Sequence, residues 1–138
     1  MRQALEGGCL CGAVQYRIGV APLDAGYCHC RLCQRSSGAP ALAWLTAQIH
    51  GFSYTKGRPA VFPSSPHSQR EFCSACGTQI AFRRSDSPTT VDVTLASLHD
   101  PSLIAPQYHI WRNSKIAWFE TADSLPRHQD AGPDRHET

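Results

Sequence analysis

The segment Cys73–Gly77, "CSACG", repeats a pattern that occurs near the start of the chain as "CLCG", Cys9–Gly12. In both, a glycine follows the second of two closely spaced cysteines. Glycine suits a tight turn that needs a positive φ and that brings backbone N–H groups toward a metal-bound sulfur. Two such knuckles can face each other and close a tetrahedral zinc site of four thiolates. Such a site would join segments more than sixty positions apart and staple a sheet across a long loop.

The three remaining cysteines form a separate cluster, Cys28, Cys30 and Cys33, in "YCHCRLCQR". Structural zinc sites usually close with four ligands, so three thiolates indicate a catalytic zinc whose fourth position receives water or a substrate. Three thiolates around Zn²⁺ leave a formal charge of −1, which makes the metal a weak Lewis acid that favours a soft ligand. We therefore expect it to bind a substrate thiol and to keep that thiol ionised near neutral pH.

Both cysteine sets could also serve different roles. The set Cys9, Cys11, Cys73 and Cys76 could be reduced buried cysteines or could bind another metal. The triplet could be completed by His29, His67 or His109 and be structural, or it could be redox-active. His29 lies between two ligands, and in an extended C-x-C its side chain would point away from the metal. We expect two zinc ions per chain, with the triplet losing its metal more readily and so being partly occupied.

The composition limits the class of protein. A chain of 138 residues suits one domain, and 41% hydrophobic with 17% charged residues is typical of neither disordered nor membrane proteins. A net charge of +2 gives no support to nucleic-acid binding. No apolar run suggests a signal peptide or a membrane span, so we expect a cytoplasmic protein with reduced thiols and no membrane partner. The oligomeric state is not indicated.

Alternating apolar and polar residues predict half-buried strands at Val14–Ile18, Arg70–Cys73, Thr78–Arg83 and Val91–Leu98. Turn-rich segments between them, such as "YTKGRP", "FPSSPHS" and "RSDSPTT", favour an antiparallel arrangement. The fold class is therefore mainly β, a small antiparallel sheet domain stapled by zinc.

Few helices are expected. One short helix could end near Gly38, and a helical turn could begin with Asp100 as its cap and Pro101 at its first position. We expect a single zinc-binding β domain over residues 1–122. A polar tail, residues 123–138, would follow it and be loosely packed or frayed.

The three cysteine clusters, with "CHCRLCQRSSG", "REFCSACGTQI" and "YHIWRNSKIAWF", resemble the glutathione-dependent formaldehyde-activating enzyme family. Its domain also occurs in the vertebrate centromere protein V. The resemblance runs from about Gly8 to Trp118 and implies an Mss4-like (β-tent) fold. It also implies a structural zinc on the outer cysteines and a catalytic zinc on the triplet. The implied activity is that of a carbon–sulfur lyase, in which glutathione adds to formaldehyde to give S-hydroxymethylglutathione.

Glutathione carries two carboxylates, so a basic group near the triplet would be useful. Arg31 and Arg35 are nearest in sequence, although a solvated surface position is the commoner fate of such residues. Trp44, Trp111 and Trp118 are expected in the core rather than around a ligand. His109 could be a buried imidazole or could line the pocket. No proton donor can be named from the sequence.

Two further classes of function compete with the enzyme. The chain could be a zinc-binding interaction module, in which case a fourth protein ligand would cap the triplet and no cavity would lie beside it. It could also be a thiol-redox or metal-handling protein whose triplet releases its metal on mild oxidation.

Overall fold

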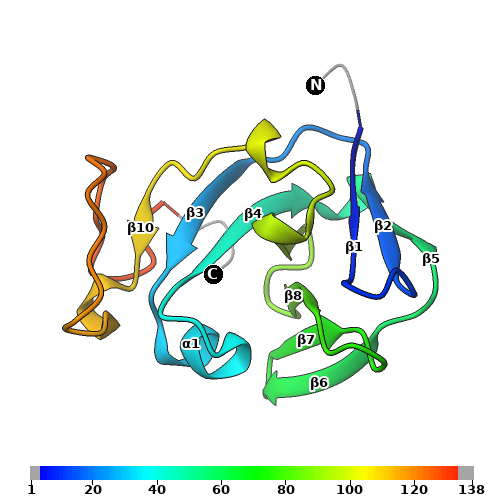
Figure 1. The fold of residues 1–138 in the computed structure, drawn as a ribbon, viewed down its shortest axis with the longest axis horizontal. Coiled ribbons are helices and arrows are strands. Elements are labelled where there is room, and N and C mark those ends of the chain that lie inside the picture. The colour runs from blue at the N-terminus through cyan, green and yellow to red at the C-terminus, as the bar shows by residue number, and fades with distance from the viewer. Residues whose placement is uncertain (1–3, 134–138) are drawn as a thin grey trace.

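The protein, represented by a computed structural model that describes residues 4–133, is built from two β-sheets (Figure 1). The smaller sheet has the antiparallel order β1-β2-β5, and the larger has the order β10-β3-β4-β9-β8-β7-β6. The strands of the smaller sheet are β1 (Leu5–Gly8), β2 (Gln15–Ile18) and β5 (Phe52–Lys56). Those of the larger sheet are β3 (Asp24–Cys28), β4 (Leu42–Gln48), β6 (Ala60–Ser65), β7 (Ser68–Phe72), β8 (Gln79–Arg84), β9 (Thr90–Thr94) and β10 (His109–Ile110). This confirms the mainly β fold class.

The core lies between the two sheets. Strand β2 contributes Tyr16 and Ile18, and strands β4 and β9 contribute Leu45 and Val93, all almost fully buried. Because side chains alternate along a strand, Trp44 and Thr46 of β4 point to the opposite face of the larger sheet. That second face carries its own small cluster of buried side chains, and it is where the candidate site lies.

All four strands predicted from alternation are present, but the one predicted over Val91–Leu98 ends at Thr94, and Leu95–Ser97 form a 3₁₀ turn. Burial does not alternate along β7, β8 or β9. Strand β9 is buried at every position rather than at every second one. It lies between β4 and β8, where one face meets the core and the other meets the candidate site. Alternation marks strands with one solvated face, so the burial of polar Asp92, which lines the cavity of the candidate site, departs from it.

The helices are short, as expected. Helix α1 (Arg31–Ser37) is followed by Gly38 with φ 73°, the left-handed cap that only glycine adopts without strain. Asp100 caps the 3₁₀ turn Pro101–Leu103 through the Ser102 N–H. Three further 3₁₀ turns are Ile49–Gly51, Leu95–Ser97 and Arg112–Ser114. No helix among residues 4–133 has the length and apolar character needed to span a membrane.

One pairing departs from the antiparallel prediction. Strand β10 pairs with β3 in parallel, His109 beside Tyr27 and Ile110 beside Cys28. It lies at the edge of the larger sheet, on the far side from β6 (Figure 1). The segment "YHIW" therefore lies directly against the start of the cysteine triplet.

The tail is more closely packed than its composition indicates, over the part that can be described. The His128 N–H donates to His109 O, the His109 N–H donates to Pro126 O, and the Trp111 N–H donates to Asp130 O. Residues 126–130 thus run along β10 and continue the sheet edge. The expectation of a loose tail is therefore wrong for this stretch, because backbone pairing needs no apolar side chains. Residues 134–138 of the tail lie outside the described part.

Candidate functional site

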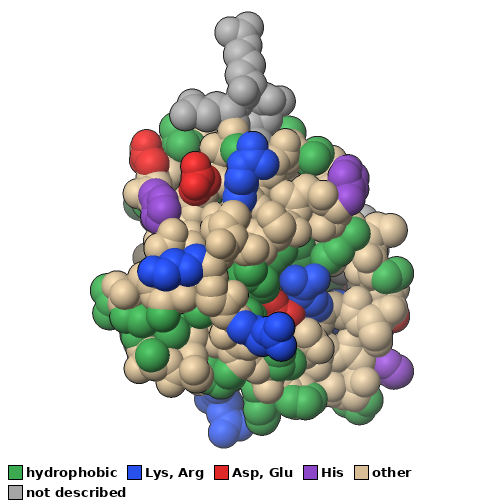
Figure 2. Space-filling model, turned by 90° about the vertical axis from the view of Figure 1, so that its right-hand side faces the viewer, with side chains coloured by type: hydrophobic (Ala, Val, Ile, Leu, Met, Phe, Trp, Pro, Cys, Tyr) green, Lys and Arg blue, Asp and Glu red, His purple; other side chains and the backbone are tan. Residues whose placement is uncertain are grey.

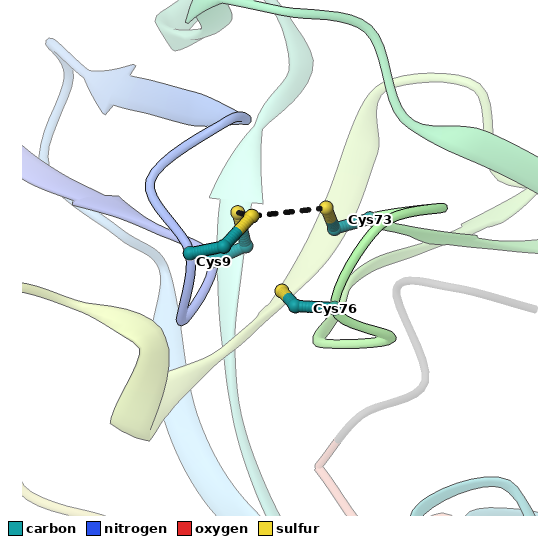
Figure 3. Close-up of side chains that lie close together, drawn as sticks. Cys9, Cys73 and Cys76 are labelled. Carbon is teal, nitrogen blue, oxygen red and sulfur yellow. Dashed lines mark hydrogen bonds between the residues drawn. The ribbon is translucent and has the colours of Figure 1, made fainter.

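The outer cysteines meet where the two sheets come together. Cys9 and Cys11 lie in the turn between β1 and β2, and Cys73 and Cys76 lie in the turn between β7 and β8. Their four sulfur atoms all lie within 4.8 Å of one another, and Figure 3 shows Cys9, Cys73 and Cys76 pointing toward a common centre. The Cys9–Cys11 and Cys11–Cys73 sulfurs are each 3.7 Å apart. Four sulfurs at about 2.3 Å from one zinc ion would be about 3.8 Å apart, so the cluster fits this metal.

Both knuckle glycines have the predicted backbone geometry. Gly12 has φ 80° and Gly77 has φ 81°, and each N–H closes a turn onto the carbonyl of the first cysteine of its pair. The backbone N–H of Val14 also points at Cys9 Sγ, 3.2 Å away, which favours a thiolate there. A hydrogen bond from the Thr78 hydroxyl lowers the pKa of Cys76 to about 5, so this cysteine too is poised as a thiolate.

The triplet lies at the junction of β3 and α1. Cys28 ends the strand, Cys30 caps the helix by accepting from the Cys33 N–H at 3.3 Å, and Cys33 lies in the first helical turn. The three sulfurs lie within 4.8 Å of one another. Hydrogen bonds from Cys28 and Cys33 lower the pKa of Cys30 to about 2, whereas the contact with Cys30 raises the pKa of Cys28. Three converging sulfurs that compete for protons in this way suit a metal ion that replaces those protons.

Within the described residues, no fourth His, Cys, Asp or Glu joins the triplet. His67 lines a separate hollow beyond β7, and His29 and His109 contact each other instead. The alternative in which a histidine completes the site therefore finds no support here. His109 is a fully buried imidazole rather than a pocket residue.

A cavity of about 350 Å³ opens beside the triplet. This volume is within the range of small-molecule sites, and the walls are mostly apolar and aromatic. The three cysteines form part of the wall, and the other lining residues are Gly26, Leu32, Trp44, Thr46, Arg70, Phe82, Arg84, Asp92, Tyr108, Ile110, Trp111 and Ser114. The cavity therefore combines a potential metal site, an apolar wall and a few charged groups.

Only one of the three tryptophans is buried, whereas all three were expected in the core. Trp44 is buried as expected, but it also lines the cavity. Trp111 lines the cavity and is 37% exposed, and Trp118 is 75% exposed, so neither belongs to the core. Both follow β10, the edge strand of the larger sheet, where few elements remain to cover them.

Arg70 of β7 is the basic group beside the triplet. It is only 7% exposed, it lies 4.8 Å above the Phe82 ring, and its Nη2 is 4.0 Å from Cys33 Sγ. Its Nη1 donates to Ser36 Oγ and Gln79 Oε1. Among the ion pairs of residues 4–133, none gives Arg70 a carboxylate partner. A buried guanidinium needs compensating charge, and the thiolates of the triplet lie beside it to supply that charge.

Arg31 and Arg35 are the basic residues nearest the triplet in sequence, and, as expected of solvated surface residues, they do not line this cavity. Arg31 donates to Gln34 on its own helix, and both side chains are exposed. Arg70 was missed because it is 37 positions from Cys33. One signal could have found it: Arg70 shares a strand face with Phe72, a position that alternation predicts to point inward. A charged residue on such a face is a candidate for a site.

Figure 2 shows one face of the molecule, where most Lys and Arg side chains lie apart and two near the centre lie close together with an acidic side chain between them. This dispersed charge matches the low net charge of +2. This face carries no extended basic surface of the kind that binds the phosphate backbone of a nucleic acid.

Comparison with known proteins adds a family to this geometry. Residues 4–114 match the family model described as "Glutathione-dependent formaldehyde-activating enzyme". A Halomonas elongata protein named "Putative glutathione-dependent formaldehyde-activating enzyme" is 30% identical over 127 residues, covering 84% of this chain and 80% of that protein. An uncharacterized lyase of Schizosaccharomyces pombe is 30% identical over 77 residues, 56% of each chain.

A solved structure is also similar. The crystal structure of a Rhodobacter sphaeroides protein superposes with a TM-score of 0.57 at 28% identity, covering 68% of this chain and 87% of that one. The family match spans all seven cysteines, and the two clusters that they form could each hold a metal ion. The chain therefore belongs to the glutathione-dependent formaldehyde-activating enzyme family.

Proposed function

We propose that this protein is a zinc-dependent enzyme of carbon–sulfur chemistry that adds the thiol of glutathione to formaldehyde. The single observation that carries the proposal is the contrast between the two cysteine clusters. Four sulfurs surround one centre, whereas three sulfurs of the other cluster line a cavity of about 350 Å³. The first arrangement suits a structural ion, and the second leaves room for a ligand.

Zinc is the metal that this donor set fits best. Thiolates are soft ligands, and a set of three or four without carboxylates favours zinc over magnesium, calcium or manganese. Zinc held by Cys28, Cys30 and Cys33 would supply a position where an incoming thiol stays ionised at neutral pH. We assign these three cysteines to the catalytic ion and Cys9, Cys11, Cys73 and Cys76 to the structural ion.

The residues of the chain would act by orientation and by charge. Trp44, Phe82 and Tyr108 form the apolar wall, which excludes water from the sulfur and strengthens nearby electrostatic interactions. Arg70 would place a fixed positive charge beside the reacting sulfur. The exposed rim formed by Leu32 and Trp111 leaves a way in for a ligand larger than formaldehyde.

The reaction itself needs little covalent help from the protein. The thiolate sulfur of glutathione attacks the carbonyl carbon, a C–S bond forms, and the carbonyl π pair moves to oxygen. That oxygen then takes up one proton, which balances the one that the thiol lost, and the product is S-hydroxymethylglutathione. Arg70 is suited to stabilise the negative charge that develops on this oxygen, because it is buried, fixed by two hydrogen bonds and part of the cavity wall.

Exchange spectroscopy provides the test. Glutathione and formaldehyde equilibrate spontaneously, so the protein should speed both directions without moving the equilibrium. We expect zinc-loaded protein to increase the NMR exchange rate between free and adducted glutathione at least tenfold. Cys30→Ser should remove the increase while leaving the fold intact. An exchange rate equal to that of a protein-free solution would refute this substrate pair.

A further inference from the structure

His29, His109 and Asp123 form a hydrogen-bonded series that runs from the triplet to the C-terminal tail. The two imidazoles of this series are buried. His29, between two cysteines of the triplet, lies with Nε2 2.8 Å from Nδ1 of His109. Nε2 of His109 is 3.0 and 3.1 Å from the two carboxylate oxygens of Asp123. The exposed fraction is 1% for His29 and 0% for His109. Neither imidazole lines the cavity, so the series lies behind the triplet rather than in front of it.

The carboxylate defines the tautomers along this series. The Asp123 carboxylate can only accept hydrogen bonds, so Nε2 of His109 carries a proton and donates a hydrogen bond to that carboxylate. Nδ1 of His109 is then an acceptor, and it receives the Nε2–H of His29. This leaves Nδ1 of His29 as a bare lone pair, which agrees with its lack of a hydrogen-bond partner within the described chain.

The backbone of His29 is held from the same direction. Its N–H donates to Ile110 O at 3.1 Å, and its carbonyl accepts from Gln34 Nε2 at 2.7 Å. Gln34 also donates to Ser114 O, beyond β10. The residue between Cys28 and Cys30 is therefore fixed by its side chain and its N–H, both on β10, and by its carbonyl, on Gln34 of α1.

Asp123 is itself held in place. Its Oδ1 accepts from the Leu125 N–H, and Arg127 lies 3.5 Å from the same oxygen. A hydrogen bond from Thr121, followed by that from His109, keeps the pKa of this carboxyl well below its usual value, so it stays ionised. The tail that meets β10 thus presents a fixed acceptor to a buried histidine pair.

We infer that Asp123 and the tail around it are a positioning element of the triplet metal site, acting through His109 on the Cys28–His29–Cys30 segment. A site with three protein ligands depends strongly on their preorganisation, because no fourth ligand holds the metal when substrate leaves. Groups that orient ligands in this indirect way commonly change metal affinity by about 10- to 100-fold. The inference rests on the metal site of the proposed function, but not on its substrates.

Metal release to a chromophoric chelator tests this inference on the protein of residues 1–138 loaded with two zinc ions. Release should be biphasic, and the faster phase is assigned to the triplet because Cys30→Ser lacks it. Asp123→Ala should accelerate the faster phase at least tenfold and leave the slower phase within twofold of wild type. Asp123→Asn keeps an oxygen acceptor for His109 and should show a smaller acceleration. Gln129→Ala replaces a tail residue whose side chain does not contact His29, His109 or Asp123, and it should change neither phase.

Histidine ¹⁵N NMR gives a second readout that a merely structural role would not move. We expect both His29 and His109 to be Nε2–H tautomers in wild type, and Asp123→Ala to abolish the single tautomer of His109. Equal acceleration of both release phases, or no change in the faster one, overturns the inference and leaves the proposed function standing. Binding of only one metal ion per chain would remove the proposed function and the inference together.

Discussion

Replacement of Cys76 by serine is expected to unfold the protein or to lower its melting temperature by about 15 °C or more. Cys30→Ser should lower the melting temperature by less than about 5 °C. Each substitution should remove about one zinc ion per chain. The two cysteines are alike in chemistry, so the difference would come from what each cluster joins.

The outer cluster joins the two sheets. Cys11 and Cys73, whose sulfurs are 3.7 Å apart, are separated by 62 positions, so metal binding there closes a long loop. Cys9 and Cys73 also belong to the main core cluster. Structural zinc contributes on the order of 10 kcal/mol to folding, which is comparable to the whole stability of a small domain. The triplet spans only residues 28–33, so its metal closes a short loop and adds less to folding.

Metal analysis of purified protein, together with thermal unfolding followed by circular dichroism, measures both effects. Wild type treated with a chelator should pass through a folded state that retains one zinc ion. Equal losses of stability in the two variants would contradict the division into a structural and an open cluster. A Cys76→Ser protein as stable as wild type would do so as well.

The fold class and the long-range tie between cysteines could be predicted because both depend on local signals. Glycine after each outer cysteine pair predicts a positive φ, and Gly12 and Gly77 have it. Apolar–polar alternation in the sequence predicts β2, β7, β8 and β9. It does not predict β3 or β4, because their sequences, DAGYC and LAWLTAQ, do not alternate between apolar and polar residues. The parallel β10 was also missed, since two residues are too few for a periodic pattern.

The site was predictable to the same extent. Spacing placed all seven cysteines in two groups, and the structure brings together the same two groups. The groups around them come from other parts of the chain: Arg70 from β7, Phe82 from β8 and Asp123 from the tail. No short-range pattern in one sequence tells which distant side chains share a cavity. Proximity in sequence could point only to Arg31 and Arg35 as candidate cations, and both are exposed on α1, as expected of surface arginines, and do not line the cavity.

Arg70→Met is expected to lower kcat/KM for the addition of glutathione to formaldehyde by about 10²- to 10³-fold, the usual effect of losing one fixed donor to a developing oxyanion. The loss should lie mainly in kcat if the guanidinium acts on charge that appears during the reaction. Arg70→Lys should fall between the methionine variant and wild type, because an ammonium keeps the charge but cannot keep the hydrogen bonds to Ser36 and Gln79 together.

Arg35→Met is the matched control for Arg70, because Arg35 is exposed and lines a hollow that adjoins Arg70 but not the cavity beside the triplet. Its kcat/KM should stay within about twofold of wild type, as surface charges contribute little. Zinc content and the circular dichroism spectrum of each variant separate a catalytic loss from a loss of metal or fold. Should Arg70→Met keep two zinc ions and wild-type kcat, the guanidinium would be only a structural counter-charge to the thiolates. A rise in KM at unchanged kcat would instead place Arg70 on a carboxylate of glutathione, and the stabilisation of the new oxygen would have to come from elsewhere in the cavity.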